Sequence, residues 1–78
     1  MPAARTDFTA LITANGWGGY EEVDFTAPRS AGDIALRLEA LKAAVTSGYR
    51  DPLRVVAIKE TATGELWYTT AEYLLTVE

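Results

Sequence analysis

The stretch FTALITANGWGGYEEVDFTA, residues 8–27, decides the fold. Each half alternates apolar and polar residues with a period of two, which is typical of strands that bury one face. Phe8 and Ile12 share one face in the first half, and Val23 and Phe25 do so in the second. The Asn-Gly step between the halves tolerates positive φ, which hairpin turns require. We therefore predict an antiparallel hairpin.

A helix is predicted next, from about residue 31 to residue 47. Ser30 lies three residues before Asp33, which resembles a capping box with an acid in the first turn. Gly48 is expected at the C′ position, and Pro52 prevents the helix from resuming.

One apolar stripe on this helix is expected to face the sheet. Its members recur at i, i+4, i+7 and i+11: Ile34, Leu38, Leu41 and Val45. They are predicted to pack on Phe8, Ile12, Val23, Phe25 and either Val56 or Ile58. Leu36 would then be an exposed leucine on the opposite side.

Two strands are predicted after the helix, at 53–59 and 65–69, joined by a turn in which Gly64 takes the left-handed conformation. Trp67 and Tyr68 should face opposite sides of the sheet. Residues 70–74 could form one helical turn followed by a strand at 75–77. Alternatively, 65–77 is a single long bent strand, and periodicity does not separate these two interpretations.

The element order is therefore β-β-α-β-β. It predicts an α+β fold in which one long helix packs on one face of a four-stranded antiparallel sheet. The 78 residues are expected to form a single compact domain, 1–78.

The chain contains no histidine and no cysteine. It therefore lacks the usual general base, the commonest metal ligand and the thiolate nucleophile. No carboxylate pair, metal-ligand spacing or phosphate-binding loop stands out. We predict a protein that is not an enzyme and that uses no cofactor or metal.

The net charge is −4, and the arginines are scattered among acids. Nucleic-acid binders usually carry a basic patch, so direct nucleic-acid binding is not expected. No apolar run is long enough for a membrane span or a signal peptide. These features favour a cytoplasmic protein that binds another protein, as a monomer or a homodimer.

The first hairpin is the predicted partner-binding site. It joins an aromatic tip to the densest acidic cluster in the chain: Trp17, Tyr20, Glu21, Glu22 and Asp24. Trp17 could instead fold back and complete the core. A second candidate surface is the outer helix face around Leu36, Glu39 and Ala43, which could equally be a homodimer seam.

Residues 30–77 resemble the small phage anti-CRISPR proteins. The likeness rests on an alanine-bearing helix (Ala35, Ala40, Ala43, Ala44), a Gly-Tyr helix exit, a Val-Val-Ala-Ile strand and the tail Leu66-Trp67-Tyr68…Ala71-Glu72-Tyr73-Leu74…Val77. It is a likeness in the order of elements and not in a signature motif, so no site residue is carried over.

The resemblance implies an inhibitor that blocks target DNA binding by a type I CRISPR-Cas effector complex. Its partner would be a Cas subunit with a basic DNA-binding surface. The alternative is a small interaction or regulatory module of phage or bacterial origin that is unrelated to CRISPR.

Overall fold

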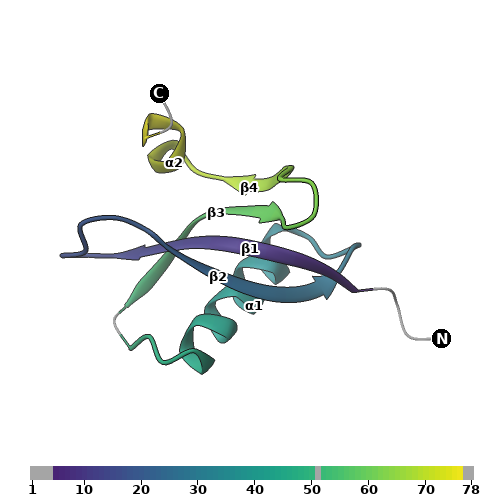
Figure 1. The fold of residues 1–78 in the computed structure, drawn as a ribbon, viewed down its shortest axis with the longest axis horizontal. Helices are drawn as coiled ribbons and strands as arrows, with labels where there is room; N and C mark the ends of the chain where they lie inside the picture. Colours follow the sequence, from purple (N-terminus) through teal and green to yellow (C-terminus); the bar gives the residue numbers. More distant parts are fainter. Residues whose placement is uncertain (1–4, 51, 77–78) are drawn as a thin grey trace.

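A computed structural model describes residues 5–50 and 52–76 of the protein. The described elements follow the chain as β1 (Arg5–Ala14), β2 (Glu21–Pro28), α1 (Asp33–Thr46), β3 (Leu53–Glu60), β4 (Leu66–Thr69) and α2 (Ala71–Thr76). Figure 1 shows the strands as one layer with α1 lying across one face. The predicted α+β class is confirmed, although α1 has only 14 residues.

The four strands form one antiparallel sheet in the order β2-β1-β3-β4. The hairpin is confirmed, since Phe8 pairs with Phe25 and Ala10 with Val23. Gly16 has a φ of 89°, as a tight turn after Asn15 requires. The central strand β1 is thereby hydrogen-bonded on both edges, and its Phe8, Ala10 and Ile12 are fully buried.

The sheet side of the core is as predicted. Buried residues on the helix-facing side include Phe8, Ile12, Val23, Phe25 and Ile58. The rings of Phe8 and Phe25 stack with their centroids 5.6 Å apart. Large side chains therefore fill this face of the sheet.

The predicted orientation of the helix was wrong for Ile34, Leu38 and Val45, although Leu41 does pack against the core. α1 buries Leu36, Ala40 and Ala44 against the sheet, whereas Leu38 is 56% exposed. The reason is steric complementarity, because small alanines let the helix approach a sheet face that already carries phenylalanines and isoleucines. A stripe of large side chains would hold the helix further away. Leu36, expected outside, is only 1% exposed.

The helix ends differ in how well the sequence predicts them. The N-cap is Gly32 with no side-chain hydrogen bond, so the capping box expected at Ser30 is wrong. At the other end Gly48 has a φ of 102°, as predicted. The amide of Gly48 donates to the carbonyl of Val45, and that of Tyr49 donates to Ala44. These two bonds form a Schellman motif.

After β4 the chain forms α2, so the single long strand and the closing strand at 75–77 are wrong for the residues that are described. Thr70 is the N-cap residue of α2, because its Oγ1 accepts a hydrogen bond from the backbone amide of Tyr73 at 3.4 Å. The same hydroxyl donates to the carbonyl of Val56 at 2.9 Å and so holds this corner to β3. Residue 77 lies outside the described part.

Trp67 and Tyr68 were expected on opposite faces, but both contact the helix side. The pairing of β3 with β4 shifts register between Ile58 and Lys59. Trp67 lies edge-on to Phe8 with ring centroids 5.0 Å apart, and Tyr68 lies under the guanidinium of Arg37. A bulge breaks the strict alternation of side chains on which the prediction rested.

Candidate protein-interaction surface

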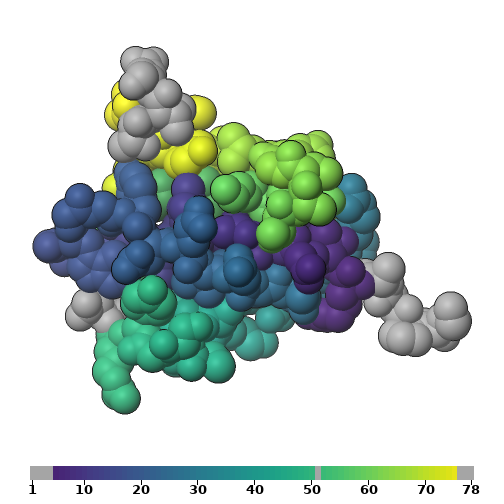
Figure 2. Space-filling model, in the orientation of Figure 1, coloured from purple at the N-terminus to yellow at the C-terminus, as the bar shows by residue number. Residues whose placement is uncertain are grey.

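Three residues of the stripe that was predicted to form the core lie on the outside of α1, and the fourth, Leu41, is half-buried and packs against the core. We call Ile34, Leu38, Leu41 and Val45 the outer stripe. Ile34 is 68% exposed and Val45 is 67% exposed. In the orientation of Figure 2, α1 and the C-terminal elements border the strand layer on opposite sides. Helix α1 thus carries apolar side chains on the face that packs on the sheet and also on the face that points away from it. This pattern is typical of a helix that is covered on two sides.

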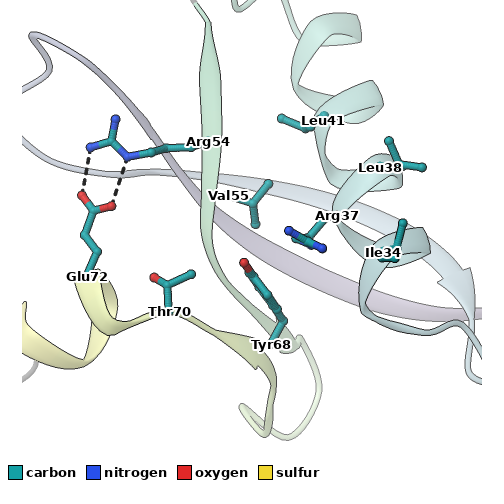
Figure 3. A pocket seen from close by; sticks show the side chains of 9 residues that line it. All are labelled: Ile34, Arg37, Leu38, Leu41, Arg54, Val55, Tyr68, Thr70 and Glu72. Carbon is teal, nitrogen blue, oxygen red and sulfur yellow. Dashed lines mark hydrogen bonds and ion pairs between the residues drawn. The ribbon is translucent and has the colours of Figure 1, made fainter.

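A groove adjoins the outer stripe, between α1 and strands β3 and β4. It has a volume of about 530 Å³, and its walls include Leu38, Leu41, Val55 and Tyr68. Figure 3 shows Leu38 and Leu41 projecting from α1, with Val55 and Tyr68 on the strands opposite. One helix is about 10 Å wide, and strands lie about 4.8 Å apart, so α1 alone does not cover a four-stranded sheet. The groove is the part of the sheet that α1 leaves uncovered.

Arg37 forms part of the groove wall. Its guanidinium carbon lies 5.1 Å from the centroid of the Tyr68 ring, within range of a cation–π interaction. Its buried Nε has no hydrogen-bond partner among the residues that the structure describes. A buried donor without a partner costs free energy, so Arg37 is held in the groove wall by its contact with Tyr68 and not by a hydrogen bond of its Nε.

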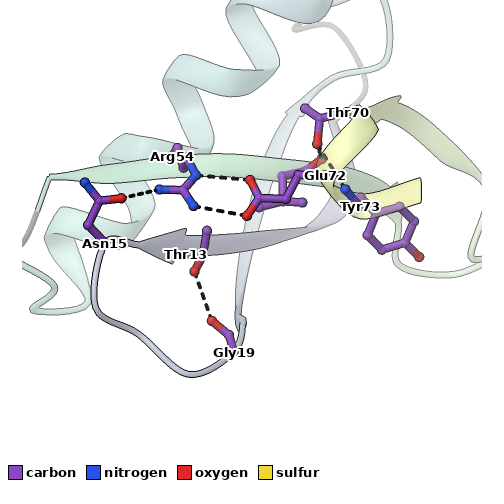
Figure 4. A network of polar contacts seen from close by, with 8 residues as sticks. Thr13, Asn15, Gly19, Arg54, Thr70, Glu72 and Tyr73 are labelled. Carbon is purple, nitrogen blue, oxygen red and sulfur yellow. Dashed lines mark hydrogen bonds and ion pairs between the residues drawn. The ribbon is translucent and has the colours of Figure 1, made fainter. Parts of the chain in front are cut away.

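The far end of the groove is held by an ion pair between β3 and α2. Arg54 binds Glu72 through two bonds, Nε to Oε1 at 3.1 Å and Nη2 to Oε2 at 3.0 Å. Its Nη1 also donates to Oδ1 of Asn15 in the hairpin turn, 3.0 Å away (Figure 4). The hydrogen bond lowers the pKa of Glu72 and raises the pKa of Arg54. This network joins the first turn, β3 and α2.

The aromatic tip of the hairpin is not a free anchor. Trp17 is half-buried, and its ring lies 5.6 Å from the ring of Tyr49 after α1. It also packs against the edge of the core, as in the alternative in which it folds back. Tyr20 is half-buried nearby, beside Gly18 and Gly19 around a shallow depression. The hairpin tip therefore has a structural role in closing this end of the core.

The predicted acidic face lies on the outer side of the sheet, and much of its charge has a partner. The carboxylate of Glu22 lies 3.8 Å from the ammonium of Lys59. Asp24 accepts a hydrogen bond from Thr9 at 2.9 Å. Glu21 is exposed at the start of β2. This face is less strongly acidic than the sequence indicates.

The side chains of residues 5–50 and 52–76 include no group of three or more acidic side chains that could hold a metal ion. Within the same residues, no helix is both long enough and apolar enough to cross a membrane. The surface that stands out is apolar, which suits it to contact with another protein.

Comparison with protein-family models, curated proteins and solved structures finds no match to this chain.

Proposed function

We propose that this protein is a non-enzymatic protein-binding module. Its binding surface is the outer stripe of α1 together with the adjoining groove. The observation that carries the proposal is the exposure of Ile34, Leu38 and Val45, each more than half exposed on one face of one helix. Contiguous apolar patches on the surface of a soluble protein mark interaction sites.

The interior of the domain makes this exposure more informative. Leu36 is the one large side chain among the fully buried residues of α1, and beside Ala40 and Ala44 only Leu41 adds a further large, half-buried contact with the core among the described residues. Leaving the larger aliphatic residues of the same helix in water forgoes the hydrophobic free energy that their burial would contribute to the stability of the monomer. Contact with a partner recovers it.

The test uses two leucines that are each more than half exposed. Leu38 is 56% exposed on the outer stripe, and Leu75 is 75% exposed on α2. Immobilised wild-type protein, Leu38→Glu and Leu75→Glu are compared for the proteins that each retains from a lysate of source cells. Retention by the wild type and by Leu75→Glu, but not by Leu38→Glu, is expected. Identical retention by all three would refute the proposed surface.

The resemblance to anti-CRISPR proteins suggests a specific partner, a type I CRISPR effector complex. The net charge of −4 supports approach to a basic DNA-binding groove, and this attraction would weaken with added salt. The assay is target-DNA binding by a purified effector complex with and without the protein. Unchanged DNA binding at saturating protein would reject this partner and leave the general proposal to the capture experiment.

A further inference from the structure

We propose that the outer stripe binds a second copy of this chain, with the two α1 helices packed antiparallel about a two-fold axis. This inference rests on the proposed function, because it names the partner that the outer stripe of α1 fits. The groove beside the stripe would border this contact.

The spacing of the outer stripe carries the inference. Its four residues are separated by four, three and four positions, which is the spacing of a and d positions in a coiled-coil seam. The spacing reads the same from either end, and so does the residue type: β-branched, leucine, leucine, β-branched. In an antiparallel pair Ile34 therefore meets Val45 of the second copy, and Leu38 meets Leu41. A two-fold interface requires such self-complementarity.

The charges beside the stripe also favour the antiparallel orientation. Arg37 precedes the seam position at Leu38, and Lys42 follows the one at Leu41. Arg37 also contacts the ring of Tyr68, and Lys42 lies 3.6 Å from the carboxylate of Glu39, so both charges are partly compensated within one chain. In a parallel pair of helices, the residue that precedes Leu38 on one helix faces the residue that follows Leu41 on the other. Arg37 of one copy would therefore oppose Lys42 of the other. Two cations would repel there. In an antiparallel pair, Lys42 faces Ala35 of the second copy, and the repulsion is relieved.

The area that two α1 helices can bury against each other determines the expected affinity of the dimer. α1 has 14 residues and is about 21 Å long. One helix pair of this length buries less than the roughly 1,200 Å² at which standard interfaces begin. We therefore expect a reversible dimer with a dissociation constant in the micromolar range, about 1–100 μM.

Sedimentation equilibrium of the full chain tests the association. The wild type and Leu75→Glu should show the same monomer–dimer equilibrium, and Leu38→Glu should weaken it at least about 100-fold, since two buried glutamates would face the seam. Circular dichroism confirms that each variant is folded. A wild type that stays monomeric up to about 1 mM would overturn the inference.

Disulfide trapping tests the orientation, because the chain has no cysteine of its own. Ile34→Cys and Val45→Cys proteins are prepared separately and then mixed under oxidising conditions. Antiparallel packing brings residue 34 of one copy to residue 45 of the other, so disulfides that join the two different variants should dominate. Copies of the same variant would hold their cysteines about 16 Å apart along the axis, too far for a disulfide. Predominance of disulfides between two copies of the same variant would overturn the antiparallel arrangement.

The two proposals fail in different ways. If the wild type is monomeric but Leu38→Glu alone loses the retained proteins, the outer stripe binds a different protein, and only the dimer is rejected. If Leu38→Glu changes neither self-association nor retention, the binding surface itself is rejected.

Discussion

The orientation of α1 makes opposite predictions for two leucines that are two residues apart. Leu36 is 1% exposed and packs in the core, whereas Leu38 is 56% exposed. Truncating a buried leucine removes its transfer free energy and leaves a cavity, at a cost of about 2–5 kcal/mol. The neighbours Ala40 and Ala44 are too small to fill that cavity. We therefore expect Leu36→Ala to fall within this range.

This cost is large beside the stability of the whole domain. At roughly 0.05–0.15 kcal/mol per residue, a chain of 78 residues is stable by about 4–12 kcal/mol. Leu38→Ala removes a side chain that is mostly in water and replaces it with a better helix former, so its effect should stay within about 0.5 kcal/mol.

Urea denaturation followed by circular dichroism measures both variants. Dilute protein is used, because dimerisation would add stability that depends on concentration. The midpoint should fall clearly for Leu36→Ala with little change in slope, and it should barely move for Leu38→Ala. If Leu38→Ala cost as much as Leu36→Ala in dilute solution, α1 would pack on the sheet through the outer stripe, and the orientation described here would be wrong.

Two further predictions concern the ends of the helices. Because Arg54 lowers the pKa of Glu72 below its ordinary value of 4.5, the ion pair stabilises the docking of α2 above about pH 4.5, and this contribution is lost as the pH falls through the lowered pKa. Glu72→Gln should therefore lower the amide protection factors of α2 at pH 7, and it should reduce the loss of protection that the wild type shows when the pH falls below the lowered pKa. An unchanged loss of protection would contradict this role. Gly48→Ala should destabilise the protein by about 1 kcal/mol, since the φ of 102° disfavours a side chain, whereas Gly18→Ala should be nearly neutral in the same thermal melt.

Local chemistry determined the four strands and α1. The alternation in residues 8–27 and the Asn-Gly turn were sufficient to predict the hairpin, because period-two patterning and positive φ depend on neighbouring residues alone. Gly48 and Gly64 marked two more turns, and both have the positive φ that was expected. The buried residues of the sheet followed from the same alternation.

The candidate surface was the part that the sequence could not place. Ile34, Leu38, Leu41 and Val45 form the strongest apolar stripe on α1, and periodicity does not say whether such a stripe meets the sheet or another molecule. The alanines at 40, 43 and 44 could have shown which face of α1 meets the sheet, because small side chains suit close packing against a sheet face that is already filled by phenylalanines.

The sequence by itself determined the four strands and α1, because that choice depends on backbone preferences and short-range patterns, but it left α2 undecided between a helical turn and a strand. Only the tertiary structure decided which side of α1 faces inward, where the bulge in β4 turns Trp67 and Tyr68 to the same side, and that Trp17 rests on Tyr49. These outcomes depend on the volumes that distant segments bring together, and a volume match between a helix and a sheet is a property of the assembled layers.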